Sequence, residues 1–200
     1  ATTLAYKLLQ KTSQQLSKYK TLKNGTVSTL RKPTICPRQT EEKPMDSIKL
    51  TEMTQEQFGN YLPYVKELFT QQIAGNGVDD NTAQNYSEKS ITAILENGRE
   101  TPGHYFFVAQ KNEETVGHLW VEKETDKLNR LRVFIYMVDV LPRHRHNGYA
   151  TQILEFAKTW GQKNQAQKLE LNVFGHNKGA QKLYERFGMT VSQKTYSMDL

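Results

Sequence analysis

Apolar residues recur at helical spacing along the first half of the chain. They fall every three or four positions over residues 58–73, and a Gly-Asn-Gly turn at 75–77 follows, which predicts an amphipathic helix that ends there. Ser87, a favoured N-cap residue, precedes a second pattern of this kind and Gly98 follows it, so we expect a second helix between them. The short apolar stretch at residues 48–53 predicts a strand ahead of both helices.

Three strands are expected in the middle of the chain. Residues 105–110 are apolar and aromatic, and residues 115–122 alternate between apolar and polar side chains after a polar turn. Residues 132–140 are almost continuously apolar, which is typical of a strand covered on both faces. We therefore expect this last strand to be central in a sheet.

Helices and strands alternate in the last third of the chain. A helical pattern begins at Ala150 and is expected to stop at Gly161, and residues 168–174 alternate as a strand does. A final helix over 178–187 and one or two strands within 189–200 complete the order β-α-α-β-β-β-α-β-α-β. Strand-helix-strand units place their strands in parallel, whereas the hairpins of the middle are antiparallel. The prediction is an α/β (α+β) fold with a mixed, mostly antiparallel central sheet flanked by helices.

Charge divides the 200 residues into two parts. Residues 1–44 carry nine Lys and Arg against two Glu, a charge of +7, so the rest of a chain of net charge +6 sums to −1. We expect a basic arm at 1–44, helical in part over 4–19 and a linker over 24–44, followed by one domain at 45–200. The arm has few aromatic residues, which favours a solvated segment over a nucleic-acid platform. A transit-like segment, or an extension ahead of a shorter protein that starts at Met45, also stays open.

Several classes of protein are disfavoured by simple counts. The single cysteine, Cys36, rules out a disulfide framework and a cysteine-based metal site, and it suits a reducing, cytoplasmic setting. No apolar run approaches the eighteen residues or so of a membrane-spanning helix, so no membrane partner is expected. No phosphate-binding G-x-x-x-x-G-K-[ST] loop occurs, and the five histidines have no spacing that suggests a metal. We expect no metal cofactor.

An anion site is predicted where the strand 132–140 leads into the helix from Ala150. The connection ends in Arg-His-Asn-Gly-Tyr-Ala at 145–150. Backbone N–H groups at a helix start lack intrahelical partners, and the helix dipole adds positive charge there. Gly148 allows a close approach of the backbone, and Arg145 adds a charged donor suited to phosphate. The pattern indicates a pyrophosphate cradle, and a surface turn with an unrelated arginine is the alternative.

Two phrases at a fixed distance carry more information than either one alone. They are Val140-x-Pro142-x-x-Arg145-x-x-Gly148-x-Ala150 and Asn177-x-x-Ala180-x-x-Leu183-Tyr184-x-x-x-Gly188. With both present, the chain resembles the GNAT superfamily of acyl-CoA-dependent N-acyltransferases, and small bacterial members above all, from about residue 48 to residue 200. The resemblance implies acetyl-CoA as co-substrate and a sheet whose two parallel strands are splayed at the acetyl-CoA site.

The resemblance also implies which residues contact acetyl-CoA. The pyrophosphate would lie on the backbone of the cradle, and the pantetheine arm along the end of the strand at 132–140. The residues expected to bind it are Val140, Leu141, Arg145, His146, Asn147, Gly148, Tyr149, Ala150, Thr151, Asn177, Ala180 and Tyr184. His146 stands where glycine is common in similar proteins, which leaves the path of the loop open.

Two residues are candidates for proton transfer. The resemblance implies that Tyr184 is the general acid for the CoA thiolate, although a tyrosine on the apolar stripe of a helix is also explained by packing alone. Asp139 interrupts an apolar strand just before the cradle and is the candidate general base. An aspartate that faces an edge or bridges to water is the alternative. Met137 stands where some similar proteins carry a second acid, so a water chain also stays open as the route of the proton.

These residues together predict an N-acetyltransferase that moves an acetyl group from acetyl-CoA to a primary amine by direct attack in a ternary complex. The acceptor would be a small molecule or a peptide, held by helices within residues 54–100. Two alternatives stay open: a non-catalytic acyl-CoA-binding regulatory module, and an RNA- or ribosome-associated acetyltransferase that the basic arm targets. A homodimer is compatible with either.

Overall fold

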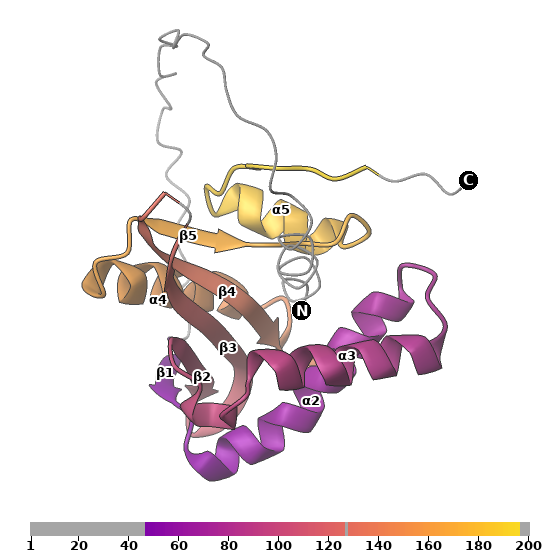
Figure 1. The fold of residues 1–200 in the computed structure, drawn as a ribbon. Coiled ribbons are helices and arrows are strands. Elements are labelled where there is room, and N and C mark those ends of the chain that lie inside the picture. The colour runs from indigo at the N-terminus through magenta and orange to yellow at the C-terminus, as the bar shows by residue number, and fades with distance from the viewer. Residues whose placement is uncertain (1–46, 127, 197–200) are drawn as a thin grey trace, which may run out of the picture.

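The computed structural model describes residues 47–126 and 128–196 and places one five-stranded sheet at the centre (Figure 1). The strands lie in sequence order, and every neighbouring pair is antiparallel except the last, which is parallel. They are β1 (Lys49–Glu52), β2 (His104–Lys111), β3 (Glu114–Thr125), β4 (Leu131–Val140) and β5 (Lys168–Leu171). The predicted mixed, mostly antiparallel sheet is therefore confirmed.

Helices cover both faces of this sheet (Figure 1). The helices are α2 (Gln55–Ala74), α3 (Asp80–Ile94), α4 (Tyr149–Lys163) and α5 (Lys178–Arg186), with short 3-10 turns η1 (Gly98–Glu100) and η2 (Pro142–His144). Helices α2 and α3 pack on one face, and α4 and α5 share the core of the other. The alternation of strand side chains explains this division: Phe106 belongs to the first core and Phe107 to the second.

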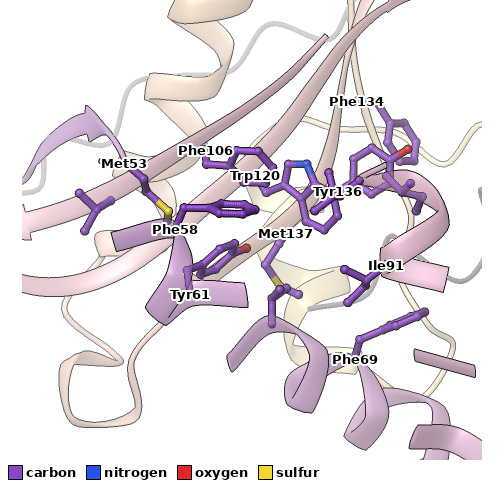
Figure 2. Packing of buried hydrophobic residues seen from close by; sticks show 14 of the residues in the cluster. Met53, Phe58, Tyr61, Phe69, Ile91, Phe106, Trp120, Phe134, Tyr136 and Met137 are labelled. Carbon is purple, nitrogen blue, oxygen red and sulfur yellow. The ribbon is translucent and has the colours of Figure 1, made fainter. Parts of the chain in front are cut away.

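The core beneath α2 and α3 is rich in aromatic side chains (Figure 2). Trp120 of β3 stacks on Tyr136 of β4, with ring centroids 4.6 Å apart and an interplanar angle of 14°. Phe58 of α2 meets Phe106 edge-on at 4.7 Å. Contacts of this kind add to the apolar area that the rings bury, and they hold α2 against the sheet.

A β-bulge changes the alternation of side chains within β4. Trp120 pairs with Met137 while Val121 pairs with Ile135, so Tyr136 is an extra residue on β4. As a result, Tyr136 and Met137 both belong to the core under α2 and α3, whereas Ile135 belongs to the core under α4. Beyond the bulge, Asp139 lies on the α2 face.

The two parallel strands separate before β4 ends. Their ladder runs from Arg132–Lys168 to Ile135–Leu171, and β4 then continues to Val140 without β5. This divergence at the end of β4 is the splay that the resemblance implied.

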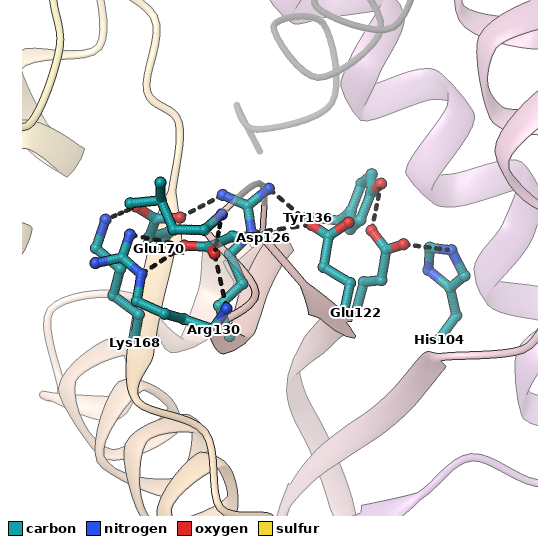
Figure 3. A network of polar contacts seen from close by, with 10 residues as sticks. His104, Glu122, Asp126, Arg130, Tyr136, Lys168 and Glu170 are labelled. Carbon is teal, nitrogen blue, oxygen red and sulfur yellow. Dashed lines mark hydrogen bonds and ion pairs between the residues drawn. The ribbon is translucent and has the colours of Figure 1, made fainter.

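Ion pairs hold the other end of the same strands together (Figure 3). Arg132 of β4 bonds Glu124 of β3 at 2.9 Å and also pairs with Glu170 of β5. Glu122 accepts a hydrogen bond from the Tyr136 hydroxyl at 2.8 Å. Because these groups are partly buried and shared among three strands, they are expected to contribute more than isolated surface pairs. They fix the sheet at the end far from Asp139.

The predicted start of the second helix is wrong. Helix α3 begins at Asp80, and Asp79 caps it by accepting a hydrogen bond from the Thr82 N–H at 3.0 Å. Ser87 lies inside the helix, buried, and its hydroxyl donates to the Lys66 carbonyl of α2 at 2.8 Å. The first turns of α3 are polar, so hydrophobic spacing gave no sign of where the helix begins.

Three boundaries later in the chain are also corrected. Gly161 does not stop α4, which runs on to Lys163; a Cβ at Gly161 would lie 3.3 Å from Val133 Cγ2, so glycine serves close packing there. The strand expected over 168–174 is limited to β5, because the chain then departs from β4. Residues 189–196 contain no strand. The expected arm at 1–44, its helix over 4–19 and its linker over 24–44 lie outside the described residues.

Gly117 of β3 provides a test of how closely the strands approach near Asp139. A Cβ at Gly117 would lie 2.3 Å from the Asp139 carbonyl oxygen, which no side chain tolerates without movement of β4. We expect Gly117→Ala to destabilise the protein by roughly 1–3 kcal/mol. Gly59→Ala is the matched control: its Cβ meets nothing within 4 Å, and Ala should stabilise α2 by roughly 0.5–1 kcal/mol. Thermal denaturation measures the stability of both variants. Equal midpoint temperatures would show that β4 does not approach Gly117 as closely as the structure indicates.

Candidate functional site

The loop between β4 and α4 forms a cradle of free backbone donors, which we define as residues 145–151. Gly148 precedes α4 in the left-handed conformation with φ of 77°, and His146 is left-handed as well, with φ of 66°. Within the described chain, the N–H groups of residues 146–150 donate to no acceptor. Unpaired N–H groups at a helix start attract anions, and the helix dipole adds to the effect. The predicted anion site therefore has the required backbone geometry.

The side chains of the cradle have different roles from its backbone. Arg145 is exposed, and its Nε donates to the Val140 carbonyl at 3.2 Å, which holds the guanidinium at the end of β4. Asn147 uses its amide to brace the loop, donating to the His144 and Arg145 carbonyls at 3.1 and 3.2 Å. Tyr149 is buried against the core under α4, so only its backbone faces the cradle. The donors that remain free in the cradle are therefore mainly main-chain groups.

Thr151 and Ala150 complete the cradle on the first turn of α4. The Thr151 N–H donates to the Gly148 carbonyl at 3.1 Å, so the backbone donors end at residue 150. Both side chains are partly buried.

The second motif lies on α5. Asn177 caps this helix, since its Oδ1 accepts a hydrogen bond from the Ala180 N–H at 3.0 Å. The capping role accounts for an asparagine at this position independently of any ligand. Ala180 and Tyr184 pack into the core under α4.

Tyr184 keeps its proton at neutral pH. It is 7 % exposed, and burial raises the pKa of its hydroxyl to about 12. Within the described chain, no hydrogen bond engages this hydroxyl. A protonated phenol without a partner is compatible with proton donation and equally with the packing role considered above.

Asp139 joins three elements. Its Oδ2 accepts a hydrogen bond from the Tyr64 hydroxyl of α2 at 3.0 Å and lies 3.3 Å from Nδ1 of His118 on β3. The side chain is 8 % exposed, so it does not face an edge of the sheet. Its Oδ1 is buried and has no partner within the described residues. A buried carboxylate with one unsatisfied oxygen is costly unless the site uses it.

A cavity of about 240 Å³ lies beside this carboxylate, between α2 and strands β2 and β3. It is lined by Met53, Gln57, Asn60, Tyr61, Tyr64, Val108, Thr115, His118 and Leu141. Leu141, one of the predicted residues, links the cavity to the end of β4. Arg145 bonds the carbonyl of Val140, the residue before Leu141, so the cradle and the cavity are neighbours. The splayed end of β4 therefore carries the cradle and a small hollow side by side.

Aromatic rings surround His118 in this cavity. Its ring centroid lies 5.0 Å from that of Tyr61 and 5.5 Å from that of Tyr64. Burial, and then the nearby Asp139 charge, raise the pKa of both tyrosines, so both hydroxyls stay protonated. The Tyr61 hydroxyl is buried and has no partner within the described chain.

Sequence reasoning missed Tyr61, Tyr64 and His118. The apolar helical face expected over residues 58–73 includes Leu62. The face that α2 buries contains Tyr61 instead. His118 was one of five scattered histidines, and only the pairing of β3 with β4 sets it opposite Asp139. The alternation of β3 could have placed His118 on the same face as Trp120, but nothing local reveals the register with β4.

Two other classes of site receive no support from the residues that the structure describes. No group of three or more His, Cys, Asp or Glu side chains is placed to hold a metal ion. No helix in that part of the chain has the length and apolar character needed to cross a membrane.

The left-handed backbone of His146 should lower the stability of the folded protein. A side chain in this conformation costs roughly 1–2 kcal/mol, and glycine escapes most of the cost but loses more entropy on folding. We expect His146→Gly to stabilise the protein by roughly 0.5–1 kcal/mol, whereas His146→Ala, which keeps the Cβ, should give no gain. Chemical denaturation of the two variants measures the difference. Equal stabilities would show that the loop is not strained.

Comparison with known proteins identifies the family. The family model described as acetyltransferase (GNAT) family matches residues 67–189. YycN of Bacillus subtilis (strain 168), an uncharacterized N-acetyltransferase, is 33% identical over 157 residues, which cover 77% of this chain and 99% of YycN.

Solved structures agree with the sequence match. The crystal structure of YycN superimposes with a TM-score of 0.72 at 32% identity, over 77% of this chain and 99% of that one. The aminoglycoside N-acetyltransferase AAC(6')-Iy in complex with CoA has the same fold, with a TM-score of 0.53 at 18% identity, over 77% of this chain and 95% of that one. Because the family model matches more than half of the chain, the chain belongs to the acetyltransferase (GNAT) family.

Proposed function

We propose that the protein transfers an acetyl group from acetyl-CoA to a primary amine by direct attack in a ternary complex. One observation carries the proposal: a cradle of free backbone N–H groups and a buried carboxylate lie at the same splayed end of β4. Membership of the family supports it, and so does AAC(6')-Iy, which shares the fold and was solved with CoA.

The residues of the cradle suit the phosphates of acetyl-CoA. The free N–H groups of residues 146–150 would donate to the pyrophosphate, with the Arg145 guanidinium beside them. Val140 and Leu141 lie where β4 has left β5, so the pantetheine arm would run along their backbone. Asn177, Ala180 and Tyr184 would border the same gap from α5. Bound there, acetyl-CoA supplies an activated thioester.

Two side chains would take part in proton transfer. Asp139 would promote proton loss from the attacking amine, since its carboxylate is buried and contacts two residues that line the cavity. Tyr184 would protonate the departing thiolate, which a buried and fully protonated hydroxyl is able to do. The contacts of Asp139 with two residues that line the cavity argue against a non-catalytic acyl-CoA-binding module, because a carboxylate kept only for structure needs no adjacent hollow.

The cavity beside Asp139 would receive the acceptor amine. At about 240 Å³ it falls below the roughly 300–1,000 Å³ of sites for drug-sized ligands. None of its lining residues is Asp, Glu, Lys or Arg. A small amine, or the amine end of a peptide, therefore fits the hollow better than a bulky polycation. A screen of small primary amines that reads free CoA thiol would identify the class.

Ala150→Asp tests the cradle. Aspartate in the first turn of a helix interacts favourably with the dipole, so α4 should not lose stability, yet its charge would repel the phosphates. We expect acetyl-CoA affinity to fall at least about tenfold by calorimetry, since about 1.4 kcal/mol of repulsion suffices for that change. Ala150→Ser, of similar size and uncharged, is the control and should bind as the wild type does. Equal binding by all three proteins would refute the cradle.

Asp139→Asn and Tyr184→Phe test proton transfer. Each change preserves side-chain shape and removes one proton-transfer group, so acetyl-CoA affinity and the thermal midpoint should stay near the wild-type values. We expect kcat to fall by roughly 10²–10⁴-fold in each variant, the usual contribution of general acid–base catalysis. If Tyr184→Phe turns over as fast as the wild type, Tyr184 serves packing and is not the general acid.

A further inference from the structure

We propose that His118 takes the proton from the attacking amine, and that Asp139 acts through it as a positioning residue. The inference rests on the acetyl transfer proposed above and names the group that meets the acceptor. It depends on the orientation of one ring, on the atoms that face the cavity and on the charges around Asp139.

The contact with Asp139 decides which nitrogen of His118 carries hydrogen. Nδ1 lies 3.3 Å from Oδ2, and an ionised carboxylate only accepts hydrogen bonds, so the neutral ring must carry its hydrogen on Nδ1. Nε2 then keeps a free lone pair. Among the described residues Nε2 has no partner, and His118 lines the cavity. The ring therefore presents a proton acceptor to the place where the amine would bind.

Asp139 is less accessible to the amine than His118. It is not among the residues that line the cavity, and its Oδ1 is buried. Its Oδ2 is engaged by the Tyr64 hydroxyl at 3.0 Å as well as by His118. Tyr64 thus holds the carboxylate from α2 while His118 separates it from the hollow. The carboxylate can orient the ring and stabilise its charge without direct contact with the acceptor.

The charges around Asp139 favour a cation on His118. No lysine or arginine of the described residues forms an ion pair with Asp139, so the buried carboxylate lacks a permanent counter-ion. An imidazolium beside it would supply one, and this stabilisation grows as the proton is transferred. The rings of Tyr61 and Tyr64 also lie beside the imidazole, tilted by 42° and 54° with centroids at 5.0 and 5.5 Å.

The amine nitrogen forms a bond to the acetyl carbonyl carbon, and the carbon–sulfur bond breaks. The amine proton goes to Nε2 of His118, and the Tyr184 hydroxyl gives its proton to the departing sulfur. His118 then releases its proton to solvent and Tyr184 regains one from it, so both residues return to their starting states.

A pair of variants separates the base from the hydrogen bond. His118→Asn keeps an N–H donor near the position of Nδ1, and so the contact with Asp139, but it has no Nε2. With 2-phenylethylamine as the probe amine, we expect kcat to fall roughly 10²–10⁴-fold while acetyl-CoA affinity is unchanged. His118→Ala should lose as much and regain at least about tenfold on addition of imidazole, which a structural role would not explain. Turnover in His118→Asn near the wild-type value, or a loss in His118→Ala that imidazole does not repair, overturns the proposal.

Nitrogen NMR tests the tautomer without any acceptor. Once the pH is raised until the His118 signals no longer change, uniformly ¹⁵N-labelled wild-type protein should carry hydrogen on Nδ1 of His118 and none on Nε2. His118→Asn assigns its signals, and Asp139→Asn should reverse the tautomer because an amide can donate to Nδ1. Hydrogen on Nε2 in the wild type overturns the proposal. If the wild-type protein acetylates no amine, the proposed acetyl transfer is refuted. The tautomer measured by NMR still tests whether His118 donates to Asp139 through Nδ1.

Discussion

One extra residue in β4 determines where the chemistry of this protein can occur. Without the bulge at Tyr136, strict alternation from Ile135 would place Asp139 on the α4 face, away from α2. The bulge moves Met137 to the α2 face and Asp139 with it, opposite His118 and within reach of Tyr64. The cavity, the carboxylate and the histidine meet only because of this change in register.

The sheet is held together at one end and open at the other. Arg132 and its glutamate partners tie β3, β4 and β5 together where β4 begins, while the β4–β5 ladder stops at Ile135. The separation is thereby confined to the end of β4 that leads into α4. Backbone donors, partly buried polar groups and a small hollow gather there, whereas the rest of the sheet is covered by two well-packed cores.

The site contains some of the strained and unsatisfied groups among the described residues. His146 has a left-handed backbone, and the Tyr61 hydroxyl and Asp139 Oδ1 are buried without partners within the described residues. Each is unfavourable for folding, and the close fit of Gly117 against β4 shows how tightly the same region is packed. Left-handed residues and an unsatisfied Gln72 oxygen also occur elsewhere, so the site is distinguished by two buried, unsatisfied oxygens that lie close to one cavity.

The sequence by itself determined the family, the order of elements through α5, the sheet class and the place of the cradle, because helical spacing, alternation and the glycine of a helix start are local properties. It also drew attention to Asp139 as an acid in an apolar strand. It misplaced the start of α3 and gave Gly161 the wrong role, since a polar first turn and a packing glycine have no periodic signal. Only the tertiary structure decided that Asp139 meets His118 and Tyr64. Those contacts depend on a bulge and on cross-strand register, which arise from pairing between distant segments and leave no mark on either segment alone.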